Sequence, residues 1–230
     1  MKLILFDIDG TMLWTDGAGR RAMEGALTLV FGSPGAATYR YDGKTDRQIV
    51  RELMREEGHD DGGIDARLSE VLDEYLARLD RELTRDEPQA HRYHGVLELL
   101  DALEARSDRI LGLLTGNLVE GARKKLSAVG IDPDRFRVGA FGSDHESRPE
   151  LPAIAMRRSH ESLGVLLDGD RVIIIGDTPA DIHCGRGVGA RAIGVATGHY
   201  SVDDLAEHGP AAVFADLRDT AAVMQAIDDA

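Results

Sequence analysis

Residues 3–11 read Leu-Ile-Leu-Phe-Asp-Ile-Asp-Gly-Thr, a short apolar run that ends in two carboxylates and a glycine. An apolar run of this length is typical of a buried strand, and α/β proteins bind their ligands at the carboxyl ends of such strands. Two carboxylates so close together can hold a divalent cation. An Asp-x-Asp by itself is equally compatible with an ordinary polar exit from a strand, so the rest of the chain must decide.

Five further apolar runs have the length of buried strands. They lie at residues 110–114, 138–141, 172–175, 192–195 and 212–214. Helical patterns separate most of them: apolar residues recur at i, i+3, i+4 and i+7 over 96–103, and 118–129 reads as another helix. Strands that alternate with helices predict an α/β fold with a doubly wound parallel sheet.

Residues 15–92 break this alternation, because they show helical patterns and no convincing buried strand. Apolar residues between 68 and 83 form one face of a long helix. Thr45-Asp46-Arg47-Gln48 fits a capping box at the start of another. The sequence therefore predicts an all-helical cap, residues 15–92, inserted into a core made of residues 1–14 and 93–230. A cap inserted directly after the first strand would cover the carboxyl edge of the sheet.

Two more polar clusters follow predicted strands. One is Leu-Leu-Thr-Gly-Asn at residues 113–117, and the other is Ile-Ile-Ile-Gly-Asp-Thr-Pro-Ala-Asp at residues 173–181. Thr115 could simply cap the next helix. Asp181 could be the third residue of a capped helix that starts Thr-Pro-Ala-Asp. Neither capping role explains Asp177, which is therefore the stronger candidate for a metal ligand.

The three clusters, in this order and each at the end of a predicted strand, resemble the motifs of the haloacid dehalogenase (HAD) superfamily of hydrolases. The resemblance covers the whole chain. It is greatest to the branch of phosphoglycolate phosphatase-like and β-phosphoglucomutase-like proteins with helical caps. It implies a Mg²⁺-dependent phosphatase that hydrolyses a small phosphomonoester through an aspartyl phosphate. Asp7 would be the nucleophile and Asp9 the general acid and base.

The resemblance also implies roles for the other motif residues. Asp7, the backbone carbonyl of Asp9, and Asp177 would hold the Mg²⁺ ion. Asp181 would orient metal-bound water or a basic partner. The residues expected to bind the phosphoryl oxygens, with help from the start of the helix near residue 118, are Thr115, Gly10, Gly116 and Asn117.

The third motif of the family departs from its usual form here. It is normally a lysine, often followed by proline, between the second and fourth motifs. This chain has no lysine after Lys125, and we expect Lys124 and Lys125 to be solvated on the helix after Thr115. Arg148-Pro149 stands in the expected place, so Arg148 is predicted to supply the missing cation and to lower kcat on removal with little loss of stability. The alternative is an ordinary loop arginine in an arginine-rich chain.

The predicted cap carries Arg20 and Lys44, which we expect to contact the substrate. Gly43-Lys44 precedes the capped helix in a way that resembles the substrate-facing loop of related caps. The alternative for both residues is a solvated charge on a helical surface.

Composition limits the partners. The formal charge of −14, from 41 acidic and 27 basic residues, argues against nucleic acid and against anionic membranes. Cys184 is the only cysteine, which favours a reducing compartment, and we expect a buried thiol and a cytoplasmic protein. We see no apolar run near the roughly 18 residues that a membrane span needs. The expected partner is a small phosphorylated metabolite, for a monomer or a homodimer.

Two other functions stay open. A phosphomutase of the same fold would use the same Asp7 and Asp9 but return the phosphoryl group to a second hydroxyl. A non-catalytic phosphate-binding protein could keep the fold without the reaction. A dehalogenase is disfavoured, because it needs neither Asp9 nor Asp177. The sequence does not choose among phosphoglycolate, a sugar phosphate and a nucleoside monophosphate.

Overall fold

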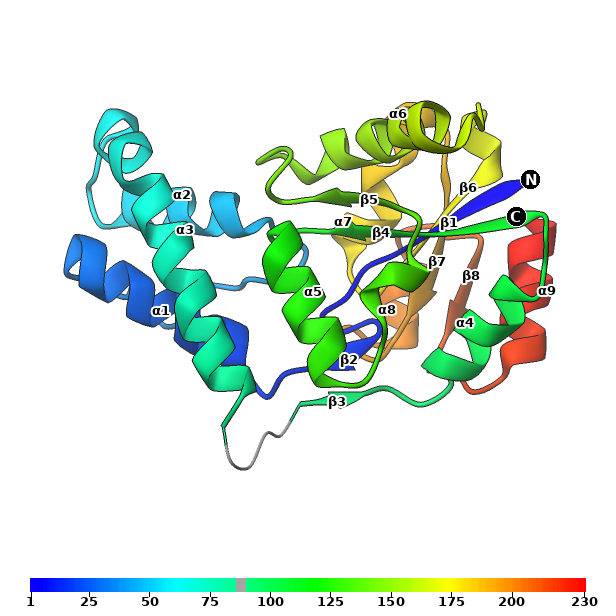
Figure 1. Ribbon diagram of the computed structural model, residues 1–230, viewed down its shortest axis with the longest axis horizontal. Helices are drawn as coiled ribbons and strands as arrows, with labels where there is room; N and C mark the ends of the chain where they lie inside the picture. Colours follow the sequence, from blue (N-terminus) through cyan, green and yellow to red (C-terminus); the bar gives the residue numbers. More distant parts are fainter. Residues whose placement is uncertain (86–89) are drawn as a thin grey trace.

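A six-stranded parallel sheet forms the centre of the computed structural model, which describes residues 1–85 and 90–230 (Figure 1). The strands lie in the order β5-β4-β1-β6-β7-β8. Their bounds are β1 (Lys2–Phe6), β4 (Arg109–Thr115), β5 (Val138–Phe141), β6 (Val172–Gly176), β7 (Arg191–Val195) and β8 (Ala212–Phe214). Each lies within one residue of its predicted ends, so the prediction of a doubly wound α/β fold is confirmed.

Helices cover both faces of the sheet, because alternate residues of each strand are apolar on both sides. In β1, Ile4 and Phe6 belong to one apolar cluster and Leu3 and Leu5 to another. The first face is covered by α4 (Val96–Glu104), α5 (Val119–Ala128) and α9 (Thr220–Asp229). The second is covered by α6 (Leu151–Leu163), α7 (Pro179–Cys184) and α8 (Val202–Ala206). Figure 1 shows α6 above the sheet and α4 and α9 below it.

The order of the strands reverses beside β1. The chain adds β4 and β5 on one side of β1 and then β6, β7 and β8 on the other. A ligand crevice forms at the carboxyl ends of the strands at such a point, since the two following connections leave toward opposite faces. Asp7 directly follows β1 and Asp177 directly follows β6, so the topology brings the two together.

Three helices pack on one another beside this edge of the sheet. They are α1 (Ala18–Phe31), α2 (Asp46–Glu56) and α3 (Asp61–Leu83), and they share an apolar cluster of their own. Thr45 caps α2 as predicted, and its Oγ1 accepts a hydrogen bond from Gln48 N (3.1 Å). The reciprocal half of the predicted capping box is not seen at Thr45 N, and Gln48 Nε2 donates to Glu52 Oε1 (2.7 Å).

The sequence analysis missed a short pair of antiparallel strands. β2 (Leu13–Trp14) pairs with β3 (His91–Arg92) and joins the chain that enters the three helices to the chain that leaves them. Two-residue strands are too short to show an alternation of apolar and polar residues, so no pattern could reveal them.

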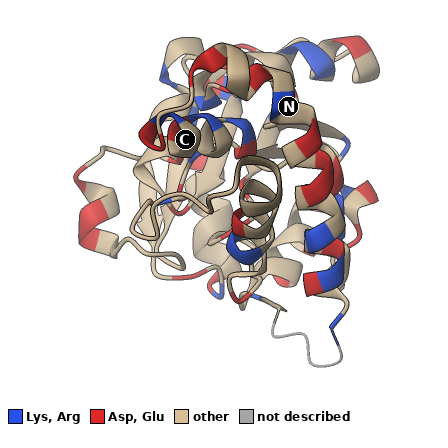
Figure 2. Ribbon diagram, turned by 90° about the vertical axis from the view of Figure 1, so that its left-hand side faces the viewer, with Lys and Arg blue, Asp and Glu red and all other residues tan. Residues whose placement is uncertain are grey.

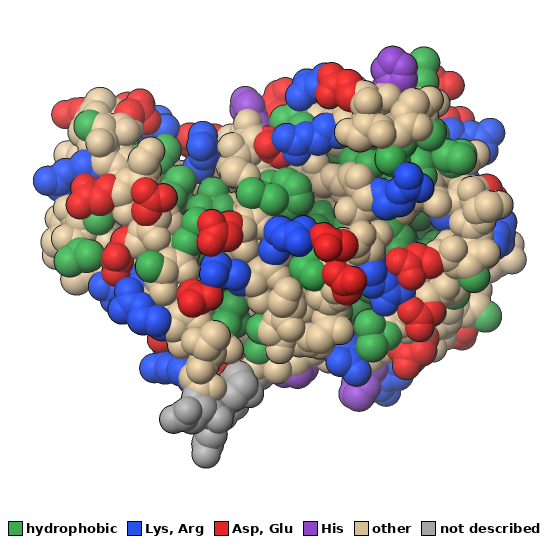
Figure 3. Space-filling model, in the orientation of Figure 1, with side chains coloured by type: hydrophobic (Ala, Val, Ile, Leu, Met, Phe, Trp, Pro, Cys, Tyr) green, Lys and Arg blue, Asp and Glu red, His purple; other side chains and the backbone are tan. Residues whose placement is uncertain are grey.

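Short 3₁₀ turns and a mixed surface complete the fold. The turns are η1 (Pro133–Arg135), η2 (Arg148–Glu150), η3 (Gly169–Arg171) and η4 (Arg186–Val188). Acidic and basic residues alternate along the helices (Figure 2), and both signs are interspersed over the face shown in Figure 3. Within residues 1–85 and 90–230, no helix combines the length and the apolar character that a membrane crossing requires.

Candidate active site

Three buried carboxylates meet at the carboxyl ends of β1 and β6. Asp7, Asp177 and Asp181 each offer an oxygen within 4.8 Å of the others. Asp7 comes from the end of β1, Asp177 from the end of β6 and Asp181 from the first turn of α7. Oxygen ligands in this number and arrangement suit a hard divalent cation. The chain therefore contains a buried acidic group that could bind a metal.

The electrostatics of the cluster fit a cation. Burial raises the pKa of the Asp7 carboxyl to about 6, with the Arg148 charge opposing that rise and the Asp181 and Asp9 charges adding to it. Burial, followed by the charges of Asp181 and Asp7, raises the pKa of Asp177 well above its usual range. Like charges crowded in a low dielectric resist ionisation unless a cation balances them. A divalent ion would remove that penalty, so these residues fit the metal that the motifs imply.

Arg148 reaches this cluster from η2, which packs against α7. Its Nη2 lies 3.1 Å from Asp7 Oδ1 and also contacts Asp181 Oδ1. The residue is only 4% exposed, so the alternative of an ordinary loop arginine does not describe its place. A buried guanidinium between two carboxylates is held in one orientation and stays charged. The structure thus brings the residue predicted to replace the family lysine into contact with the predicted nucleophile.

Asp181 combines the two roles that its sequence left open. Its Oδ2 accepts hydrogen bonds from Thr178 N (3.0 Å) and Thr178 Oγ1 (2.7 Å), which completes a capping box at the start of α7. Its Oδ1 contacts Arg148. Both oxygens therefore already have donors, so Asp181 acts on the cluster chiefly by holding Arg148 against Asp7.

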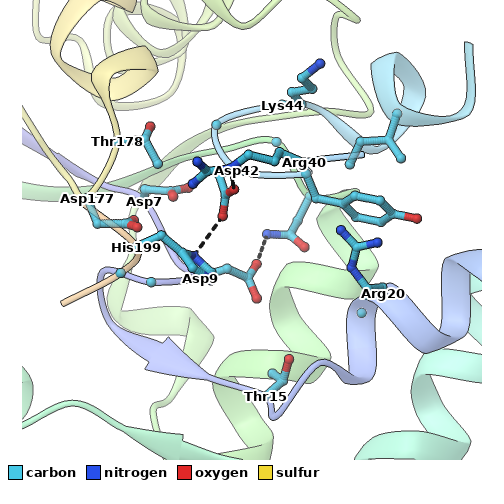
Figure 4. Close-up of a pocket in the computed structure, with 18 of the residues that line it drawn as sticks. Asp7, Asp9, Thr15, Arg20, Arg40, Asp42, Lys44, Asp177, Thr178 and His199 are labelled. Atoms are coloured by element: carbon cyan, nitrogen blue, oxygen red, sulfur yellow. Dashed lines mark hydrogen bonds and ion pairs between the residues drawn. The ribbon is translucent and has the colours of Figure 1, made fainter. Parts of the chain in front are cut away.

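Asp9 projects into the same region from the loop after β1, as Figure 4 shows. Asn117 Nδ2 donates to Asp9 Oδ2 (2.7 Å) and to Thr115 Oγ1 (2.8 Å). The Lys125 ammonium donates to Asp9 Oδ1 (2.9 Å) and Oδ2 (2.8 Å) and to Asn117 Oδ1 (2.7 Å). The second motif and α5 thus converge on the predicted general acid.

The expectation that Lys125 is solvated is wrong. Lys125 is 4% exposed and pairs with Asp9, whereas its neighbour Lys124 lies at the surface and pairs with Asp80 (2.6 Å). Successive residues of a helix point about 100° apart, so adjacent lysines can face a cleft and the solvent. The periodicity of α5 carried the missed signal, because Ala122 and Val129, three residues before and four residues after Lys125, lie on the same side and are buried.

The glycines of the motifs let neighbouring groups approach the backbone closely, and the N–H of Gly10 bonds within the protein. Gly10 has φ +82°, and a Cβ there would lie 2.2 Å from Asp177 Oδ2; its N–H donates to Leu13 O (3.0 Å). A Cβ at Gly198 would lie 1.9 Å from the same oxygen. A Cβ at Gly116 would lie 2.0 Å from Lys44 O. The Gly10 N–H is thus engaged within the protein, and its part in binding a phosphoryl group stays a prediction. Gly198, which the sequence analysis missed, belongs to the wall around Asp177.

The start of α5 is also engaged within the protein. Leu118 N donates to Asp46 Oδ2 (2.8 Å) and Val119 N to Ser143 Oγ (3.3 Å). Asp46 N in turn donates to Gly116 O (2.8 Å). The Leu118 N–H is thus held by α2, which docks on the second motif, and the Val119 N–H by Ser143. Their contribution to binding a phosphate stays a prediction.

A cavity of about 750 Å³ connects the carboxylates with the three helices. Ligand sites in proteins commonly have volumes of roughly 300–1,000 Å³, so a drug-sized or sugar-sized molecule fits. Aromatic side chains line it, together with the catalytic candidates. They are Trp14, Tyr39, Tyr41, Tyr75 and Tyr93.

Both predicted cap contacts line this cavity, and both are already paired. Arg20 bonds to Glu24 and to Tyr39 O and stacks on Tyr41 (4.1 Å to the ring centre). Lys44 pairs with Glu52. Figure 4 shows Arg20 beside the cavity and the Lys44 ammonium turned away from Asp7 and Asp9. They are neither free surface charges nor unpaired anion receptors.

Comparison with known proteins agrees with this geometry. The family model described as haloacid dehalogenase-like hydrolase matches residues 4–186. An N-acetylmuramic acid 6-phosphate phosphatase of Pseudomonas aeruginosa is 29% identical over 216 residues, which are 94% of this chain and 91% of that protein. A hydrolase from Pseudomonas syringae superposes with a TM-score of 0.74 at 21% identity, and a predicted phosphoglycolate phosphatase from Haemophilus somnus with 0.70 at 20%; both alignments cover 98% of each chain.

The chain belongs to the haloacid dehalogenase-like hydrolase family. It is a hydrolase, and the phosphatase class expected from its motifs is confirmed. The similarity to the solved structures supports the fold alone, because the sequence identities are low.

Proposed function

We propose that this hydrolase is a Mg²⁺-dependent phosphatase that acts on a small phosphomonoester through an aspartyl phosphate on Asp7. The observation that carries the proposal is the buried Asp7 at the cavity, with Arg148 3.1 Å from its Oδ1 and Asp177 beside it. Arg148 occupies Oδ1, and no hydrogen bond or ion pair to Oδ2 is seen in the part of the chain that the structure describes. Oδ2 is therefore the oxygen that we assign to attack.

In the first step a bond forms between Asp7 and phosphorus while the bond from phosphorus to the ester oxygen breaks. Asp9 gives its proton to the departing oxygen, so the alcohol leaves neutral. In the second step Asp9 takes a proton from water, the water oxygen attacks phosphorus, and the bond to Asp7 breaks. Inorganic phosphate leaves and both carboxylates return to their starting states.

Two further groups assist from fixed positions. Thr115 Oγ1 accepts from Asn117 Nδ2, which leaves the hydroxyl proton to donate to a phosphoryl oxygen. Arg148 keeps Asp7 ionised and in place, since its own position is fixed by Asp181. Asp7, Asp177 and the backbone carbonyl of Asp9 would hold Mg²⁺, which screens the charge of the phosphate from the nucleophile when bound.

We further propose that residues 15–92 act as a cap domain on a core of residues 1–14 and 93–230. The three helices complete the cavity, and Arg20 and Lys44 lie on their side of it. Because each of these cations already has a carboxylate partner, they favour hydroxyl and ring contacts over a second anionic group on the substrate. The expected partner is a small phosphorylated metabolite, and the single buried cysteine suits a reducing, cytoplasmic setting.

A screen of phosphorylated metabolites for released phosphate tests the proposal. Sugar phosphates, nucleoside monophosphates and phosphoglycolate should be compared, each with Mg²⁺ and with EDTA. Phosphate released in a one-to-one ratio with alcohol supports a phosphatase. Isomerisation of a sugar phosphate without free phosphate would indicate a mutase, and phosphate binding without turnover a non-catalytic protein.

A further inference from the structure

A buried lysine on α5 has no place in the motifs and yet makes closer polar contacts with Asp9 than any other cation in the described residues. Lys125 Nζ lies 2.9 and 2.8 Å from the two carboxylate oxygens of Asp9 and 2.7 Å from Asn117 Oδ1. Asn117 donates to the same carboxylate from its amide nitrogen (2.7 Å). Asp9 itself lies on a loop and its side chain is 36% exposed, so the backbone alone does not fix its orientation.

Groups of the three helices α1, α2 and α3 lie around Lys125. A Cβ at Gly19 of α1 would lie 3.3 Å from Lys125 Nζ and 3.9 Å from Tyr75 Oη of α3, so these groups crowd one spot. The Lys125 charge also opposes the effect of burial, which raises the pKa of Asp46 to about 6. Asp46 belongs to α2 and bonds to the backbone of residues 116 and 118. Groups of α1, α2 and α3 therefore surround the Lys125 ammonium.

We propose that Lys125 is a positioning residue that holds Asp9 for proton transfer and that the three helices complete its site. This inference rests on the proposed phosphatase function. When Asp9 passes its proton to the leaving oxygen, negative charge develops on a carboxylate whose two oxygens face the ammonium. The Lys125 ammonium and the Asn117 amide hold this carboxyl group in one orientation at the cavity, so it is placed for the transfer. The benefit is greatest where the leaving group needs a proton.

The dependence on the leaving group separates this role from a structural one. An alkyl phosphate requires protonation of its leaving oxygen, whereas 4-nitrophenyl phosphate releases a stabilised phenolate without it. The value of kcat/KM reports the steps up to departure of this group, so a slower second step does not enter it. General acid catalysis contributes about 10²- to 10⁴-fold. Loss of its positioning should therefore lower kcat/KM for the alkyl ester by about 10- to 100-fold more than for the aryl ester.

The experiment compares Lys125→Met, Lys125→Gln and the control Lys124→Met on both esters with Mg²⁺. The control removes a lysine from the same helix whose partner is Asp80 at the surface, and its two kcat/KM values should stay within about twofold of wild type. Lys125→Gln keeps a neutral donor for Asp9 and should recover part of the alkyl rate. Circular dichroism and thermal melting show whether each variant is folded.

Equal losses on the two esters, or no loss, in folded Lys125→Met would overturn the assignment and leave the phosphatase proposal standing. If Lys125→Met does not fold, the same comparison in Lys125→Gln decides, and equal losses there overturn the assignment as well. A wild-type protein that releases phosphate from neither ester and from no compound of the metabolite screen would overturn the proposed function, and with it the role of Lys125 in that reaction.

Discussion

Replacing Arg148 by alanine removes the only guanidinium in contact with Asp7 within the described part of the chain. Its Nη2 is 3.1 Å from Asp7 Oδ1 and also contacts Asp181. We expect kcat to fall, because the charge that keeps Asp7 ionised and aligned disappears. The pKa of Asp7, raised to about 6 by burial, should rise further once the opposing charge is removed.

The magnitude follows from the contact. Two unit charges about 4 Å apart interact by roughly 4 kcal/mol at an effective dielectric constant of 20. Loss of one preorganised donor from a transition state costs about 2.7–4 kcal/mol, or roughly 10²- to 10³-fold in kcat. We therefore expect Arg148→Ala to lose about that factor and Arg148→Lys, which keeps the charge but not the fork, to recover part of it.

Burial changes the expectation for stability. The sequence analysis predicts that Arg148, as the missing cation, can be removed with little loss of stability. A buried ion pair that loses one partner typically destabilises a protein by about 3–5 kcal/mol, because the remaining charge stays uncompensated. Urea unfolding of Arg148→Ala should show a loss of this order in EDTA and a smaller loss in Mg²⁺, because a cation can take over part of the balance.

The assay is steady-state phosphate release at saturating substrate, with Arg157→Ala as the matched control. Arg157 is exposed on α6 and pairs only with Glu161 (3.7 Å) among the described residues, so its removal should leave kcat within about twofold of wild type. A kcat for Arg148→Ala within threefold of wild type would refute the reasoning. Arg158 pairs with Asp144, so it is not available to replace Arg148 as the cation beside Asp7.

Three further outcomes are expected. Asp7→Asn should abolish turnover without unfolding the protein, and EDTA should silence the wild type until Mg²⁺ is restored; activity within tenfold of wild type in either test would contradict the assignment. Arg20→Ala and Lys44→Ala should change KM and the ranking of substrates more than kcat, and an unchanged ranking in the metabolite screen would exclude them from recognition. Asp46→Asn should flatten the pH dependence of stability. In the wild type, burial raises the pKa of Asp46 from 3.8 to about 6. Asp46 is therefore more protonated in the folded than in the unfolded state in this window, and its contribution to the free energy of unfolding falls by roughly 3 kcal/mol as pH rises from about 4 to 6. Urea titrations of both proteins at several pH values measure this slope, and identical slopes would contradict the account.

The sequence predicted the strands of the sheet closely, because each strand is a separate apolar run that can be recognised from neighbouring residues alone. The runs at 172–175 and 192–195 became β6 and β7 with one added residue at one end of each. The pair β2 and β3 was missed, since its partners are far apart in sequence and two residues long. Pairing of that kind depends on where the flanking helices lie, which no local pattern specifies.

The sequence by itself determined the residues that follow β1 and β6, because the identity and spacing of Asp7, Asp9 and Asp177 are written in the chain and the strand ends must bring them to one edge. The sequence also pointed to Arg148 but left an ordinary loop arginine open. Only the tertiary structure decided that Arg148 is buried against Asp7 and that Lys125 pairs with Asp9. Arg148 meets Asp7 across 141 residues of chain, and Lys125 meets Asp9 across 116. Whether a charged side chain is solvated or buried against a carboxylate depends on which face of its element is covered by distant segments. The physical reason is that desolvation and pairing act through space, whereas the sequence records only position along the chain.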